Sequence, residues 1–168
     1  AIIAANKTIK LQPKHPSGYF VKGIALFRSG SYEKAQAAMT EAIKINPRAI
    51  YYSLRGLIYI PQMKWDLALA DLNEAIKINP QSYYGHALRG FVYKLQEKWD
   101  LALADFNKAI EINPYNDDFN VYENRVEIYE KQEKWDLAIA DYSKWIEFES
   151  KNINPYTYRG LVYLKQEK

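Results

Sequence analysis

The sequence predicts an all-α fold, a solenoid of antiparallel helical hairpins, because several features repeat with one period. Residues 64–80 read KWDLALADLNEAIKINP, and residues 98–114 repeat this stretch with few changes. A looser copy, KWDLAIADYSKWIEFES, occupies residues 134–150. Self-similarity at a fixed period of this length indicates a repeat architecture. Three kinds of residue show the period independently, at spacings of 33 to 36 residues: Trp65, Trp99 and Trp135; Pro13, Pro47, Pro80 and Pro114; Gly23, Gly56 and Gly90.

Each repeat reads as two helices joined by a short turn. Apolar residues within 65–78 recur at three- and four-residue steps, which places them on one face of a helix. Asn79-Pro80 ends this helix, because proline cannot continue a helix and disfavours helical geometry at the residue before it. Residues 54–60 show the same apolar spacing ahead of it. Every period therefore contains a first helix and a second helix.

Composition limits the function classes but does not choose among them. The chain has 168 residues, 48% of them hydrophobic and 26% charged, which is ordinary for a globular domain. A formal net charge of +3 is too small to indicate nucleic-acid binding by itself. Cysteine is absent, which excludes disulfides and thiolate chemistry, and no apolar run reaches the roughly 20 residues of a membrane span. The compartment stays open, with the cytoplasm favoured, and the start at Ala1 suggests a segment of a longer array.

The repeated residues resemble the tetratricopeptide repeat, a helix–turn–helix unit with a Gly-x-x-Tyr core, an Ala-x-x-x-Phe core and a closing proline. Two units match it most fully: Gly56/Tyr59, Ala68/Leu72 and Pro80, then Gly90/Tyr93, Ala102/Phe106 and Pro114. The resemblance implies a right-handed α-solenoid that forms a single domain over residues 1–168. It divides the chain into a half unit at 1–13, whole units at 16–47, 49–80, 83–114 and 119–150, and a half unit at 153–168.

Some repeated positions are predicted to hold the stack together. The glycines allow close approach of the two helices, and the three tryptophans are expected in the core, sealing the turn between them. An arginine before the glycine and an aspartate past the turn should face each other in successive units, as a structural ladder: Arg55 with Asp71, Arg89 with Asp105, and Arg125 with Asp141. The first whole unit has Lys22 and Ala38 instead, so it loses both partners together.

The resemblance also implies that the first helices line a concave surface, where positions that vary between units are free to bind a partner. Side chains at i, i+4 and i+7 share one helical face. The resulting groove is apolar in the first three units and acidic in the fourth, which suits a peptide or amphipathic helix of another protein that carries basic residues. Contact with neighbouring helices, and a merely solvated glutamate row, are the alternatives. The candidate residues are Phe20, Ile24 and Phe27; Ser53, Leu57 and Ile60; Ala87, Phe91 and Lys94; and Glu123, Glu127 and Glu130.

The sequence shows no catalytic, cofactor-binding or metal-binding site, so we expect a non-catalytic scaffold. His15 and His86 are the two histidines, one in a predicted loop and one in place of a core aromatic residue. Readers of RNA carry base-selecting polar side chains on the matching helix face, where this chain has apolar ones, so nucleic acid is not an expected partner. The alternatives are a regulatory or targeting segment of a larger enzyme, and a self-association module.

Relatives that clamp chaperone tails use Lys, Asn and Arg on their first helices. Those places hold apolar and aromatic residues here, which argues against this activity: Phe20, Ile24, Leu54, Tyr84 and Leu88.

Two further expectations concern the C-terminal part. Asp117 or Asp118 should cap the next helix, with a calcium loop as the alternative. Helix 155–168 has no following helix to cover it, so it is predicted to pair with a second copy as a homodimer.

Overall fold

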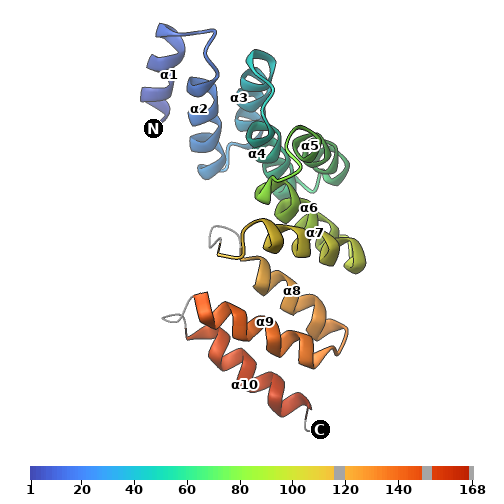
Figure 1. The fold of residues 1–168 in the computed structure, drawn as a ribbon. Helices are drawn as coiled ribbons and strands as arrows, with labels where there is room; N and C mark the ends of the chain where they lie inside the picture. Colours follow the sequence, from blue (N-terminus) through green and yellow to red (C-terminus); the bar gives the residue numbers. More distant parts are fainter. Residues whose placement is uncertain (116–119, 149–152, 167–168) are drawn as a thin grey trace.

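The computed structural model describes residues 1–115, 120–148 and 153–166, and all regular structure within these ranges is helical. This confirms the all-α fold class. Figure 1 shows an elongated array with the two chain ends far apart. The helices are α1 (Ile2–Leu11), α2 (Pro16–Arg28), α3 (Tyr32–Ile45), α4 (Ala49–Tyr59), η1 (Ile60–Gln62), α5 (Trp65–Ile78), α6 (Tyr83–Leu95), α7 (Trp99–Ile112), α8 (Val121–Lys131), α9 (Trp135–Phe148) and α10 (Asn154–Gln166).

The helices pair as hairpins in chain order. α2 packs on α3, α4 on α5, α6 on α7 and α8 on α9, while α1 covers α2 and α10 covers α9. The first helices also contact one another along the array, α2 with α4, α4 with α6, and α6 with α8. Each second helix packs against the first helix of the next unit as well. The first helices therefore form one continuous layer, and the second helices form the other (Figure 1).

Local capping explains where several helices begin. The Ser82 hydroxyl accepts a hydrogen bond from the Gly85 backbone amide at 3.1 Å, and Asn120 does the same for Glu123 at 3.1 Å. Such bonds satisfy backbone amides that have no partner within the first turn. The cap of α8 is thus Asn120. Asp117 and Asp118, for which a capping or calcium role was considered, lie outside the described residues.

The turn inside each unit contains one residue with left-handed backbone geometry. The first unit uses Gly30 at φ 75°, whereas the next three use Met63, Glu97 and Glu133 at φ 55° to 57°. Glycine adopts this region without steric cost, whereas a residue with a Cβ adopts it with some strain. Equivalent turns therefore recur although the glycine that would favour them is present in one unit.

The two helices of a unit approach most closely at the recurring glycine position of the internal repeat. A Cβ built on Gly56 would lie 2.9 Å from Cγ of Leu72, and one on Gly90 would lie 2.9 Å from ring carbons of Phe106. Leu72 and Phe106 are fully buried. The glycines are thus required by the bulk of the facing side chain, as the repeat pattern predicted.

The tryptophans are less buried than the sequence suggested. Trp65, Trp99 and Trp135 are half-buried, and each packs one side against a buried cluster at the start of a second helix. A lysine ammonium lies over two of these rings: Lys131 Nζ is 5.1 Å from the ring centre of Trp99, and Lys165 Nζ is 5.6 Å from that of Trp135. Because the turn is at the edge of the hairpin, a large ring there covers the core without entering it.

Candidate functional site

The predicted ladder of arginines and aspartates is present in three units. Arg55 donates to both carboxylate oxygens of Asp71, from Nε at 2.7 Å and from Nη2 at 2.8 Å. Arg89 binds Asp105 with the same two distances. These paired bonds match the planar fork of a guanidinium to a carboxylate.

The third pair of the ladder, Arg125 with Asp141, has the same two-bond geometry. Its aspartate side chain is 5% exposed, and those of the other two pairs are 9% and 7% exposed. The ladder is therefore an interior feature, and its members are not free to bind a ligand.

Each arginine also reaches the preceding unit, which the sequence analysis missed. Its remaining Nη1 donates to a polar side chain on the previous second helix, over 2.6 to 3.0 Å: Thr40 for Arg55, Asn73 for Arg89, Asn107 for Arg125 and Ser143 for Arg159. The signal was available, because a polar residue lies two positions after the ladder aspartate in three copies, and two positions after Ala38 in the first unit. One arginine thus joins three helices.

The aspartates differ in their surroundings. Burial alone would raise the pKa of Asp105, but hydrogen bonds from Arg89 and His86 outweigh it and hold this pKa below its usual value. His86 Nδ1 lies 3.0 Å from Oδ1 of Asp105, and its Nε2 lies 3.2 Å from the Pro80 carbonyl oxygen. At Asp141, burial raises the pKa, and Arg125 lowers it by less. The extra donor at Asp105 accounts for the difference in sign.

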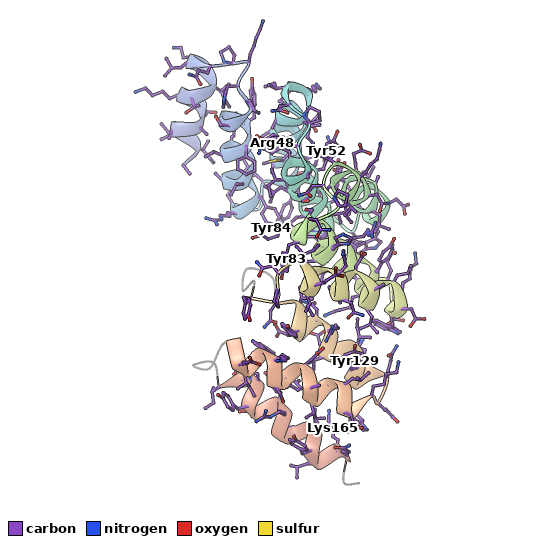
Figure 2. All side chains as sticks on the ribbon, viewed as in Figure 1. Arg48, Tyr52, Tyr83, Tyr84, Tyr129 and Lys165 are labelled. Carbon is purple, nitrogen blue, oxygen red and sulfur yellow. The ribbon has the colours of Figure 1, made fainter. Side chains whose placement is uncertain are left out.

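An apolar cavity opens between the first helices α2, α4 and α6. It has a volume of about 380 Å³. Among the described residues that line it, Arg28 alone carries a charge. Tyr84, which is labelled at the start of α6 in Figure 2, is one of the residues that line it. The structure brings together here five of the residues predicted for the groove: Phe20, Ile24, Phe27, Ser53 and Leu57.

Three predicted groove residues are buried instead of exposed along the wall. Ser53, Ile60 and Ala87 pack inside the layer of first helices, so the expectation of an open surface is wrong at these positions. Ala87 belongs to the core cluster that α6 forms with α7 and α8, and Ile60 to the cluster that α4 and η1 form with α5 and α6. Phe91 is half-buried and packs against two core clusters, and the Lys94 ammonium lies 5.5 Å from its ring centre.

The acidic end of the groove is partly neutralised by the chain itself. Glu123, Glu127 and Glu130 line a second hollow of about 450 Å³ between α8, α9 and α10. Lys94 pairs with Glu127, and Glu130 accepts hydrogen bonds from the Tyr142 hydroxyl at 2.8 Å and from Lys165 at 3.2 Å. This row is therefore less available to a basic partner than its charge suggested.

Within residues 1–115, 120–148 and 153–166, no group of three or more histidine, aspartate or glutamate side chains is placed to hold a metal ion. No helix in the described part of the chain combines the length and the apolar character needed to cross a membrane.

Comparison with family models decides the classification. Two models, both described as tetratricopeptide repeat, match this sequence: one over residues 83–116 and the other over residues 1–50 and 20–83. The chain belongs to the tetratricopeptide repeat family. Tetratricopeptide repeats are generally modules for protein–protein interaction without catalytic activity. No curated protein sequence matches the chain.

Solved tetratricopeptide repeat structures share the fold. TTC0263, a thermophilic protein of Thermus thermophilus, has a TM-score of 0.80 at 20% identity, covering 97% of this chain and 89% of its own. MamA has a TM-score of 0.74 at 22% identity, with 89% and 87% covered. YrrB, described as having an unusual peptide-binding site, has a TM-score of 0.70 at 18% identity, with 95% and 81% covered. Identities this low show the common fold alone.

Proposed function

We propose that this tetratricopeptide repeat chain is a non-catalytic scaffold that binds a peptide or amphipathic helix of another protein along its first helices. The observation that carries the proposal is the apolar cavity between α2, α4 and α6. Its volume of about 380 Å³ is within the range of small-molecule and side-chain pockets. A partner would insert a large apolar side chain there, between Ile24 and Leu57.

Two features indicate that the partner is held mainly by an apolar side chain in the cavity, and less by polar contacts along the groove. Half-buried apolar side chains converge on the cavity from three separate helices, and a sizeable apolar hollow of this kind usually marks an interaction site. The glutamates at the far end are partly paired with Lys94 and Lys165. The anchor is therefore apolar, and basic residues of the partner contribute less than the sequence suggested. That YrrB is described as binding a peptide agrees with this assignment.

The test compares two charge substitutions of equal chemistry on opposite layers. Peptides selected from a display library against the wild-type chain are assayed against Leu57→Glu and against Leu67→Glu. Leu57 lines the cavity, whereas Leu67 lies exposed on the second helix α5. Circular dichroism and thermal melting first establish that both variants are folded. We expect Leu57→Glu to weaken binding at least about tenfold, the effect of 1.4 kcal/mol, and Leu67→Glu to leave it unchanged. Equal affinity for both variants would contradict the groove.

A further inference from the structure

The three helices that form most of the apolar cavity, α2, α4 and α6, carry no acidic residue. Their sequences contain five lysine and arginine residues and no aspartate or glutamate. The whole chain has a formal net charge of +3, but residues 1–60 contain nine lysine and arginine residues against two glutamates. The remaining residues therefore carry a net negative charge. An asymmetry of this kind indicates a partner whose charge complements one part of the surface.

Most basic side chains on these helices are already paired, and one at the cavity is not. Arg55 and Arg89 bind aspartates of the ladder, and Lys94 binds Glu127. Arg28 lines the cavity, and it takes part in no ion pair among the described residues. Its guanidinium is therefore available to a carboxylate of a ligand.

The acidic residues of the groove lie farther along the array. Glu123, Glu127 and Glu130 line the hollow between α8, α9 and α10. Complementary charges set the register of an interface, and like charges that face each other weaken it. A segment that carries carboxylates is therefore favoured beside the cavity and disfavoured at α8.

The cavity also contains a buried polar atom without a partner. Ser53 lines the cavity and is 1% exposed, and within the described part of the chain its Oγ makes no hydrogen bond. An unpaired buried hydroxyl is unfavourable, so a ligand group that reaches this oxygen gains a bond that the free protein lacks. Tyrosine and tryptophan combine such a group with a large apolar ring, which suits the apolar side chains of the lining.

We propose that the partner is an acidic segment whose anchor is a tyrosine or a tryptophan. The aromatic ring fills the cavity, its polar edge bonds to Ser53, and an aspartate or glutamate beside it pairs with Arg28. This rests on the proposed binding of a protein segment along the first helices, and it names the chemistry of that segment. The carboxylate belongs to a side chain next to the anchor, so a free chain end is not required. The glutamate row had suggested a basic partner, but the surroundings of the cavity favour the opposite charge.

The test uses two synthetic peptides that differ only in the sign of their charged residues. The acidic peptide is acetyl-AEEAYELLEEAA-amide, and in the basic peptide lysine replaces every glutamate. Each carries a dye and is titrated against the whole protein by fluorescence anisotropy. We expect the acidic peptide to bind at least about tenfold more tightly than the basic one. The difference should shrink as salt rises, because salt screens charges at the rim of the cavity.

Substitutions in the protein assign the two contacts. Arg28→Gln should weaken binding of the acidic peptide about fivefold, whereas Lys34→Gln, the same loss of charge at an exposed lysine of α3, should leave it nearly unchanged. A phenylalanine version of the acidic peptide should bind the wild type about threefold more weakly than the tyrosine version does. Both versions should bind Ser53→Ala equally, because removal of either hydroxyl removes the same hydrogen bond. Circular dichroism and thermal melting first establish that the variants are folded.

The outcomes separate this proposal from the groove itself. If the peptides of the display library lose affinity with Leu57→Glu, but the acidic and basic peptides bind equally, the groove stands and the acidic partner is overturned. No saturable binding of the acidic peptide below about 1 mM would overturn it as well. Equal affinity of the tyrosine and phenylalanine versions for the wild type would overturn the anchor. Octanoate is the competitor: displacement of the acidic peptide at concentrations below the dissociation constant of the peptide would assign the cavity to a small apolar carboxylate instead.

Discussion

The third unit, α6 with α7, and the fourth, α8 with α9, carry the same arginine–aspartate pair in different surroundings. In the third, Gly90 lies against the ring of Phe106, and His86 adds a donor to Asp105. In the fourth, Val126 replaces the glycine, and the stacked rings of Tyr142 and Trp145 fill the seam. The inter-helix ion pair survives both arrangements.

The arginine–aspartate ladder and the seam, which is the apolar contact between the two helices of one unit, therefore vary independently. The ion pair is present both where one large ring faces a glycine and where two rings face a valine, with the same two-bond geometry. The seam determines how much apolar volume is buried, and the neighbours of each aspartate determine its protonation. Substitutions can therefore separate the two contributions to stability.

The largest effect is expected at the ring that faces Gly90. Phe106→Ala removes the largest fully buried side chain among the described residues and should lower the free energy of unfolding by about 3–5 kcal/mol. Phe106→Leu is the matched control, because Leu72 occupies this position below Gly56, and it should cost under about 1.5 kcal/mol. Urea unfolding measures both. A loss for Phe106→Ala no greater than for Phe106→Leu would show that the seam is loosely packed.

Asparagine substitutions should distinguish the two ladder aspartates. Asp105 is held ionised by Arg89 and His86, so Asp105→Asn removes charge-assisted bonds from two donors and should cost about 2 kcal/mol. Asp141 has a raised pKa, so a neutral side chain is better tolerated and Asp141→Asn should cost less. Chemical denaturation at neutral pH measures the order. The reverse order would mean that His86 contributes nothing to the stability of the Arg89–Asp105 pair.

Asp105→Asn and Asp141→Asn should change the pH dependence of the unfolding free energy in opposite directions. The lowered pKa of Asp105 contributes stability that is present above the pKa of the unfolded chain and is lost as pH falls through the folded value. The raised pKa of Asp141 contributes stability that is present below the unfolded pKa and is lost as pH rises through the folded value. Between about pH 6 and about pH 3, Asp105→Asn should flatten the fall in unfolding free energy, and Asp141→Asn should steepen it. Parallel curves would refute the assignment.

Glycine substitutions at equivalent positions should show how the packing of α10 differs from that of α6. Gly90→Ala places a methyl group 2.9 Å from Phe106 and should destabilise the chain by about 1–2 kcal/mol. Gly160→Ala meets nothing within 4 Å and should stabilise α10 by up to about 1 kcal/mol, because alanine favours the helix over glycine. Thermal melting of both variants measures the contrast. If Gly160→Ala destabilised the chain as much as Gly90→Ala, another group would have to pack against Gly160.

The sequence was sufficient for the features that depend on periodicity. Equivalent residues repeat their surroundings, so the hairpins, the glycine approach and the pairing of Arg55 with Asp71 could all be inferred from one copy and checked in the next. The groove was less predictable, because exposure of a face depends on how closely neighbouring first helices approach. A helical face at i, i+4 and i+7 contains Ser53 and Ile60, yet the contacts of α4 bury both.

The pairing of charged residues on the groove was also hard to predict, because it too depends on how neighbouring units stack. The row of Glu123, Glu127 and Glu130 was read as an acidic patch, since its partners come from other units. Lys94 is one period away from Glu127, and Lys165 reaches Glu130 from the last helix. Pairing across units depends on the superhelical stacking, which a single repeat does not encode. Between units the spacing could have indicated the recurring arginine contacts to the preceding second helix, but not these lysine–glutamate pairs.

The smallest effect is expected at the contact that joins the third and fourth units along the groove. Lys94→Gln removes the ion pair with Glu127 and weakens the bond to Asn124, which is 2.8 Å long. Because the Glu127 side chain is 54% exposed, solvent and salt screen the pair, and the loss should be under about 1 kcal/mol. Melting in low and high salt is the measurement: the difference between wild type and variant should shrink as salt rises. Lys98→Gln, the same substitution at an exposed lysine, serves as the matched charge change. A salt-independent loss would indicate that Lys94 acts through packing on Phe91, where its ammonium lies 5.5 Å from the ring centre.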